Sequence, residues 1–228
     1  MSPTGSTSPT PQFCNSRRVP AAKSPAEVAA LIVRRDRSFR SVVSQIGPPP
    51  RWRRAPVEDR FAALVRAITF QLLATKAADT IHGRVRDLCD QNVTTESIMS
   101  VGVGQLRAAG LSRTKAEAMV DLANQVSDQR VQLSRHGRMI DEDVLADVTA
   151  VRGIGPWTAH MYLLSALARA DVWPAGDFGV RNGWSIIHGL DEIISEAELT
   201  GAGEKFEGVR SSVAWYCWQA VHLDRQAN

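Results

Sequence analysis

The sequence predicts an all-α protein. Apolar residues recur at three- and four-residue spacing through most of the chain after residue 58, whereas the alternating pattern of strands is nearly absent. Prolines and glycines stand where these periodic stretches begin and end, as they do at helix termini. With 228 residues and 44% hydrophobic content, the chain is long enough to bury a substantial core.

The N-terminal part divides into a tail and a helix. Residues 1 to about 23 are rich in Ser, Thr and Pro and lack apolar periodicity, which predicts a disordered tail. Ser24-Pro25-Ala26-Glu27 is typical of a helix start, with a cap, a first-position proline and an acid that can bond back. We expect this helix to run to about Ile46, because Gly47 and the three prolines after it stop a helix.

Periodicity predicts the remaining helices. The first has an apolar face formed by Phe61, Leu64, Val65, Ile68 and Leu72. Further helices are expected over residues 79–88, 95–99, 103–109, 114–126, 142–149, 156–168, 180–187, 195–199 and 206–221.

Composition excludes some classes of protein. The net charge of +3, from 27 basic and 24 acidic residues, does not by itself indicate nucleic acid. No apolar run is long enough to span a bilayer, and the N-terminus lacks the pattern of a secretory signal. Cys14, Cys89 and Cys217 are widely separated and the five histidines are scattered, so we expect reduced thiols and no zinc.

The segment 151–159, Val-Arg-Gly-Ile-Gly-Pro-Trp-Thr-Ala, is the most informative stretch of the chain. Two glycines permit a tight turn, and Pro156 suits the first position of a following helix. The turn would present free amides beside a helix N-terminus, a place that attracts a phosphate. Together with Asp177 shortly afterwards, it indicates a protein that holds DNA and does chemistry on it. The residues expected to bind the phosphate are Arg152, Gly153, Ile154, Gly155 and Thr158.

This hairpin and four other blocks, in the same order, resemble the helix-hairpin-helix DNA glycosylase superfamily with a Gly-Pro-Asp loop. The branch they resemble is 3-methyladenine DNA glycosylase II. The other blocks are residues 61–74, 106–116, 171–181 and 210–218. The resemblance implies two helical lobes with a cleft between them: lobe one over about 58–165, and lobe two over about 24–50 plus 166–228. No N-terminal β-lobe is expected, because too few residues precede Phe61.

The resemblance implies that Asp177 is catalytic. Releasing a base from DNA builds positive charge on the sugar, which a carboxylate beside it stabilises while it orients or deprotonates water. On the residues alone, a helix N-cap is the preferred interpretation of Asp177, and the two roles can coexist. A second acid found in some relatives is replaced here by Gly176, so Asp177 is the one candidate in this loop.

Trp157 implies a monofunctional enzyme. Relatives that also cut the DNA backbone carry a lysine here, whose amine forms a Schiff base with the sugar. With tryptophan, water is the nucleophile and the product is an abasic site. Lys76 and Lys115 are expected to be solvated or to face phosphates.

The resemblance places an apolar wedge at Leu72, which would fill the gap left by the flipped base; the alternative is an ordinary core leucine. Gln71 would contact the orphaned base or the minor groove. A base pocket is expected from Trp157, Trp215, Trp218, Met161 and Gln71, since aromatic faces attract a cationic alkylated purine. For each tryptophan, core packing is the alternative.

The expected partner is double-stranded DNA containing damaged bases. We expect the protein to be a monomer that does not associate with a membrane, and to act in the bacterial cytoplasm or in a nucleus. An alkali-metal ion held by hairpin carbonyls is possible in this superfamily, but three cysteines cannot hold an iron–sulfur cluster. Arg51, Arg53 and Arg54 either contact phosphates or form a solvated linker. Two other functions stay open: excision of deaminated or oxidised bases, and DNA binding without catalysis.

Overall fold

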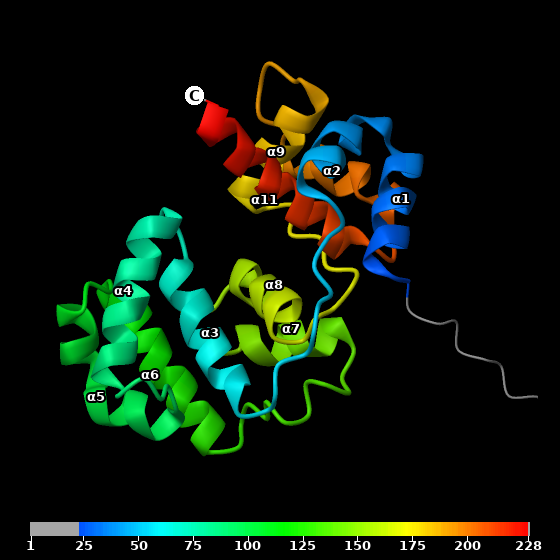
Figure 1. Ribbon diagram of the computed structural model, residues 1–228. Coiled ribbons are helices and arrows are strands. Elements are labelled where there is room, and N and C mark those ends of the chain that lie inside the picture. Colours follow the sequence, from blue (N-terminus) through cyan, green and yellow to red (C-terminus); the bar gives the residue numbers. More distant parts are fainter. Residues whose placement is uncertain (1–22, 228) are drawn as a thin grey trace, which may run out of the picture.

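The computed structural model describes residues 23–227, and over that range the chain forms eleven α-helices, two short 3-10 helices and no strand (Figure 1). The all-α prediction is confirmed. The predicted tail, residues 1 to about 23, falls almost entirely outside the described residues. The elements are α1 (Pro25–Arg35), η1 (Arg37–Phe39), α2 (Arg40–Ile46), α3 (Asp59–Phe70), α4 (Thr75–Leu88), α5 (Thr95–Ala108), α6 (Arg113–Ser127), α7 (Asp141–Thr149), α8 (Pro156–Ser165), α9 (Phe178–His188), α10 (Glu196–Ala202), η2 (Glu204–Phe206) and α11 (Arg210–Ala227).

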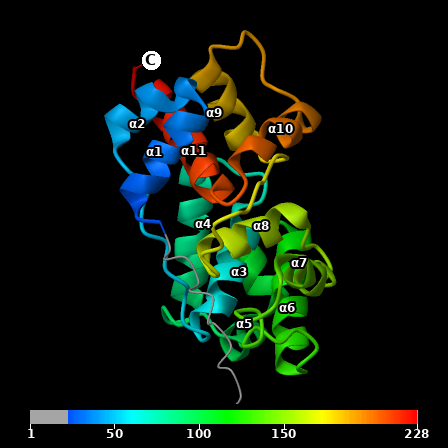
Figure 2. The ribbon, with the colours of Figure 1, turned by 90° about the vertical axis from the view of Figure 1, so that its right-hand side faces the viewer.

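The helices build two lobes, each with its own hydrophobic core. One core runs from Phe61 to Val172 and is supplied by α3 to α8. The other combines residues 29–42 with residues 175–220, so α1 and α2 pack with α9, α10 and α11. Figures 1 and 2 show this second lobe above the first, with the blue N-terminal helices beside the red α11. The first core extends a few residues beyond position 165, where the sequence suggested a boundary.

The first helix begins as predicted but ends earlier. The Ser24 hydroxyl accepts from the Glu27 amide, and the Glu27 carboxylate accepts in return from the Ser24 amide. At Asp36 the backbone becomes extended (φ −151°, ψ 113°), and η1 and α2 follow. The Asp36 carboxylate accepts from Lys205 Nζ at 2.8 Å and meets His188 Nε2 at 2.9 Å. Asp36 also caps η1 locally, because its Oδ1 accepts from the Ser38 amide at 2.9 Å, so the helix that the local pattern predicts to be continuous is broken here.

The break expected between the segments 95–99 and 103–109 is present inside α5, where Gly102 has a non-helical backbone (φ 67°, ψ 172°). Other boundaries differ from the prediction. Phe206 lies in η2, so the last helix starts at Arg210. Helix α3 ends at Phe70, so Leu72 is not part of its apolar face. Glycine allows close packing of α9 on α11, since a Cβ at Gly183 would overlap the Cys217 carbonyl.

Candidate active site

The hairpin between α7 and α8 is built around one obligatory glycine. Gly153 has a φ of 84°, which favours glycine, and a Cβ there would lie 2.8 Å from the Cβ of Ala118 on α6. Pro156 occupies the first turn of α8, as predicted. Gly155 differs: it is extended (φ −102°, ψ 177°), and a Cβ there would meet nothing within 4 Å. Glycine is therefore not needed at position 155 for backbone conformation or for packing, but it leaves the outer surface of the hairpin uncovered.

The hairpin amides divide into occupied and open ones. The Arg152 amide donates to Asp121 Oδ2 at 3.1 Å, and the Ile154 amide donates to the Val151 carbonyl at 3.1 Å. Within residues 23–227, the amides of Gly153 and Gly155 have no hydrogen-bond partner. The open donors for a phosphate are therefore at the two glycines and not at Arg152 or Ile154.

Thr158 and Gln71 support the hairpin from inside. Gln71 Nε2 donates to the Gly153 carbonyl at 3.1 Å and to Thr158 Oγ1 at 2.8 Å. The Thr158 side chain is buried, so its hydroxyl is not exposed to a phosphate, and the contact predicted at this helix start is left to the backbone amide. Gln71, expected near a base, is occupied with the hairpin and couples the end of α3 to it.

Asp177 is the N-cap of α9 and lies where the two lobes meet. Its Oδ1 accepts from the Val180 amide at 2.8 Å and from Trp218 Nε1 at 2.9 Å. Its Oδ2 accepts from Trp157 Nε1 at 2.6 Å. Three neutral N–H donors thus fix both carboxylate oxygens. No Lys, Arg or His in the described range forms an ion pair with Asp177, so its negative charge is left for a cation in the cleft.

The two indoles come from different lobes. Trp157 is in the first turn of α8, whereas Trp218 is on α11 and packs against both cores. Gly179 makes room for Trp218, because a Cβ there would lie 2.9 Å from Trp218 Cδ1. The sequence did not predict that both tryptophans donate to Asp177 or that position 179 must be glycine. Gly179, two residues after the N-cap aspartate, was the one sign in the sequence that a bulky side chain packs there.

The other predicted pocket residues are not bound to Asp177. Trp215 packs against the second core and makes an edge contact with Tyr216, with ring centroids 4.9 Å apart. Met161, one turn after Trp157 on α8, is half-buried against the first core. Cys217 is fully buried, and burial, followed by the charge of Asp177, raises the pKa of its thiol well above its ordinary value. It is therefore not a nucleophile.

A bidentate ion pair fixes the segment that carries Asp177. Arg210 donates to Asp171 through Nε at 2.8 Å and through Nη2 at 2.6 Å. The amide of Gly208 also donates to Asp171, at 2.7 Å. Burial raises the pKa of Asp171, but Arg210 and the backbone amides outweigh it and hold that pKa below its usual value. Two sequence blocks, 171–181 and 210–218, are thus joined directly.

Leu72 is fully exposed, with a relative accessibility of 103% and a φ of 52°. This position excludes the core alternative. Leu73 beside it is 39% exposed, so the loop after α3 presents apolar side chains to solvent. Such an apolar tip is suited to enter a stack of bases.

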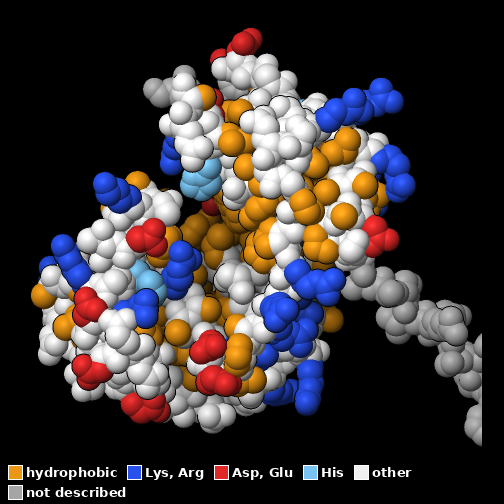
Figure 3. Space-filling view, viewed as in Figure 1, with side chains coloured by type: hydrophobic (Ala, Val, Ile, Leu, Met, Phe, Trp, Pro, Cys, Tyr) orange, Lys and Arg blue, Asp and Glu red, His pale blue; other side chains and the backbone are white. Residues whose placement is uncertain are grey.

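Basic side chains surround the cleft. Arg51, Arg53 and Arg54 are exposed on the segment that joins the lobes, and the side chain of Arg152 on the hairpin is 83% exposed. Figure 3 shows the surface hollowed between the lobes, with hydrophobic side chains in the hollow and Lys and Arg side chains on either side of it. Apolar walls and a basic border match a base held beneath a phosphate backbone.

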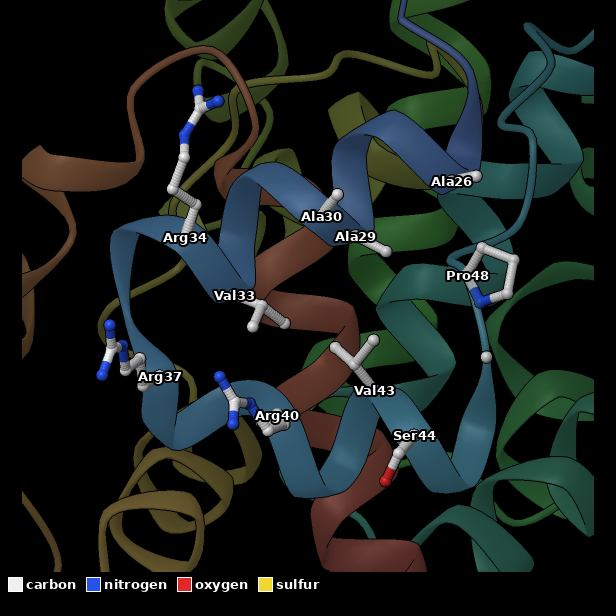
Figure 4. Close-up of a pocket in the computed structure, with 11 residues that line it drawn as sticks. Ala26, Ala29, Ala30, Val33, Arg34, Arg37, Arg40, Val43, Ser44 and Pro48 are labelled. Carbon is white, nitrogen blue, oxygen red and sulfur yellow. The ribbon is translucent and has the colours of Figure 1, made fainter.

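A separate groove of about 710 Å³ lies between α1 and α2 (Figure 4). Its lining combines Ala29, Ala30 and Val33 with arginines such as Arg37 and Arg40. None of the residues around Asp177 or the hairpin lines it. We therefore assign the chemistry to the cleft and not to this groove.

Within the described residues, no group of three His, Cys, Asp or Glu side chains could hold a metal ion. Cys89 and Cys217 are buried free thiols, and Cys14 lies outside the described residues. No helix in the described range is sufficiently long and apolar to cross a membrane.

Comparison with known proteins decides the family. Residues 65–206 match the model of the HhH-GPD superfamily of base excision DNA repair proteins. The chain belongs to this superfamily. It is 28% identical over 191 residues to DNA-3-methyladenine glycosylase 1 of Schizosaccharomyces pombe, covering 82% of this chain and 84% of that protein.

Solved structures of the superfamily share the fold. The S. pombe 3-methyladenine DNA glycosylase Mag1, in complex with abasic DNA, matches with a TM-score of 0.79 at 26% identity, over 85% of this chain and 95% of that one. A DNA-3-methyladenine glycosidase from Bacillus halodurans matches with a TM-score of 0.71 at 28% identity, over 87% and 91%. The predicted helix-hairpin-helix glycosylase fold is confirmed. In this superfamily member, the cleft is organised around Asp177.

Proposed function

We propose that the protein is a monofunctional DNA glycosylase, a base excision repair enzyme that hydrolyses the N-glycosidic bond of alkylated bases of the 3-methyladenine type. The product is an abasic site. The observation that carries the proposal is the Asp177 carboxylate, which is held by Trp157, Trp218 and the N-terminus of α9 and has no cationic partner in the described range.

The carboxylate suits a reaction with a cationic transition state. As the bond between the sugar and the base lengthens, the departing base takes the electron pair and the sugar becomes oxocarbenium-like. Asp177 stabilises that charge and accepts a proton from the attacking water. Because three donors already fix the carboxylate, little reorganisation is needed as charge develops.

The absence of an amine at position 157 supports hydrolysis rather than Schiff-base chemistry. The Trp157 indole donates to Asp177 and cannot act as a nucleophile. Lys115 is bound to the carbonyls of Thr69 and Gln71, and Lys76 lies exposed in α4. No lysine in residues 23–227 donates a hydrogen bond to Asp177.

The cleft favours a cationic leaving group. A base alkylated on a ring nitrogen carries positive charge, which both the unneutralised carboxylate and the neighbouring indoles attract. Such a base leaves without protonation, so a single carboxylate is sufficient. Several relatives of this chain are named as 3-methyladenine glycosylases, which supports the same class of lesion. A purely DNA-binding role does not require a carboxylate without a cationic partner at this position.

We further propose how double-stranded DNA is held by a monomer of this protein. The open amides of Gly153 and Gly155 bind a phosphate, Leu72 fills the gap left by the flipped base, and Arg51, Arg53 and Arg54 face the backbone. An alkali-metal ion at the hairpin carbonyls stays a prediction. The Gly153 carbonyl, which accepts from Gln71, retains a lone pair that such an ion could use.

Methylated duplex DNA provides the test. The protein is incubated with it, the DNA is heated in alkali, and strand breaks at abasic sites are counted against unmethylated DNA as the control. We expect breaks only in methylated DNA and only after alkali. Breaks without alkali would contradict the monofunctional assignment, and no breaks in either DNA would contradict alkylated bases as substrates.

A further inference from the structure

The backbone that carries Leu72 is a strained turn. Gln71 has φ −50° and ψ 125°, Leu72 has φ 52°, and the Leu73 amide donates to the Phe70 carbonyl at 3.4 Å. These values match a type II turn with Leu72 at its third position, where glycine is preferred because φ is positive. A leucine keeps such a conformation only where its surroundings impose it.

Lys115 supplies a constraint at the correct place. It lies in the first turn of α6, and its Nζ donates to the Thr69 carbonyl at 3.0 Å and to the Gln71 carbonyl at 2.6 Å. The Gln71 carbonyl belongs to the peptide group that joins Gln71 to Leu72. In a type I turn this peptide group is rotated to face the other way, and the third residue then has an unstrained negative φ.

The same lysine is not engaged in other chemistry. Its ammonium group donates hydrogen bonds to carbonyls at the C-terminal end of α3, where the helix dipole favours a cation. Burial lowers the pKa of the Lys115 ammonium, so its environment is partly shielded from water. The sequence suggested a solvated or phosphate-facing lysine, and the structure corrects this. Gln71 holds the loop from the other side through the hairpin.

We propose that Lys115 is a positioning residue that holds the Gln71–Leu72 peptide in its type II orientation and thereby keeps Leu72 directed outward for insertion into DNA. The proposal rests on the proposed function, in which Leu72 is the wedge. It adds that wedge insertion depends on an ammonium group in a different helix. If Lys115 served only as a cap for α3, its removal would affect stability without regard to Leu72.

A double-mutant cycle separates these roles. Single-turnover base release is measured for wild type, Lys115→Met, Leu72→Ala and the double variant, on a methylated duplex and on the same strand alone, with melting temperatures recorded. We expect Lys115→Met to slow release from duplex about tenfold and from single strand less than about twofold. In the Leu72→Ala background, we expect the same change to slow duplex release less than about twofold.

An equal loss in both backgrounds, or on both substrates, would overturn the proposal. If Lys115→Met does not fold, Lys115→Arg is carried through the same cycle, because it keeps a donor but displaces the charge. We then expect a smaller loss that is again specific to duplex and to Leu72. If wild type releases no base, the proposed function has failed. The cycle is then measured as affinity for duplex and single-stranded DNA that carries a tetrahydrofuran abasic analogue.

Discussion

The Trp157 indole and the Asp177 carboxylate are joined by a 2.6 Å hydrogen bond across the boundary between the lobes. Trp157 belongs to the first lobe, and Asp177 is the N-cap of α9 in the second lobe. Trp218 completes the arrangement from α11 at 2.9 Å. The candidate catalytic group is therefore also a link between the lobes, and its position depends on how the lobes are set against each other.

This relationship predicts that indole N–H groups matter for catalysis. Trp157→Phe or Trp218→Phe should each slow single-turnover base release about tenfold, because a hydrogen bond to a charged group contributes about 1.5–3 kcal/mol. Trp215→Phe is the matched control and should change the rate less than about twofold, since Trp215 packs with the second core only. Equal effects for all three variants would show that the N–H donors have no special role.

The two hairpin glycines should behave differently. Gly153→Ala should lower the free energy of unfolding by about 1–3 kcal/mol, because its φ is positive and the new methyl group would collide with Ala118. Gly155→Ala should leave the melting temperature nearly unchanged and weaken binding to duplex DNA, since its side of the hairpin is open. Thermal melts and fluorescence anisotropy with labelled duplex measure both. Undiminished DNA affinity in Gly155→Ala would argue against phosphate binding at this hairpin.

Leu72→Ala should reduce activity without reducing stability. The side chain is fully exposed, so the free energy of unfolding should change by less than about 0.5 kcal/mol. Release from duplex should slow roughly tenfold, because filling the gap offsets an unstacking cost of a few kcal/mol. Release from single-stranded DNA should suffer less. Equal losses on both substrates would remove the wedge role.

Borohydride should not trap a covalent complex between the protein and DNA. A trapped adduct requires a Schiff base, and Trp157 occupies the position where relatives carry the lysine. The measurement is denaturing gel electrophoresis of labelled methylated duplex after reduction, with a known glycosylase/lyase and its own substrate as the positive control. A stable adduct would contradict the monofunctional assignment and direct attention to Lys76 and Lys115.

The sequence predicted those features that are encoded locally. Helical periodicity, the Ser24–Glu27 cap and the proline start of α8 are short-range properties, and the structure has all three. The same holds for Asp177 as an N-cap. The break between α1 and α2 was not predicted, although Asp36 caps η1 locally; the contacts of Asp36 with Lys205 and His188, far along the chain, are visible only in the fold.

The hydrogen bonds that hold Asp177 and the Leu72 loop in place could not be predicted from the sequence either. Trp157 and Trp218 were predicted as pocket walls from the chemistry of their faces, whereas their N–H contacts with Asp177 depend on the packing of α8 and α11. Leu72 fits the apolar period of α3, but the helix ends two residues earlier. Lys115 stands 46 residues after Thr69, and only the packing of α6 beside α3 reveals that they are bonded.

The most direct test of the account is base release by Asp177→Asn. The amide oxygen can still accept from Val180 and Trp218, whereas the amide nitrogen replaces the oxygen that accepts from Trp157 and that hydrogen bond is lost; with two of the three contacts kept, the protein should fold. The loss of the negative charge should slow single-turnover release of an alkylated base from duplex by about a hundredfold or more. Affinity for the same duplex should stay equal or rise, because a charge that repels phosphate is removed. Release at a near-normal rate by a folded Asp177→Asn variant would contradict the central role of this carboxylate.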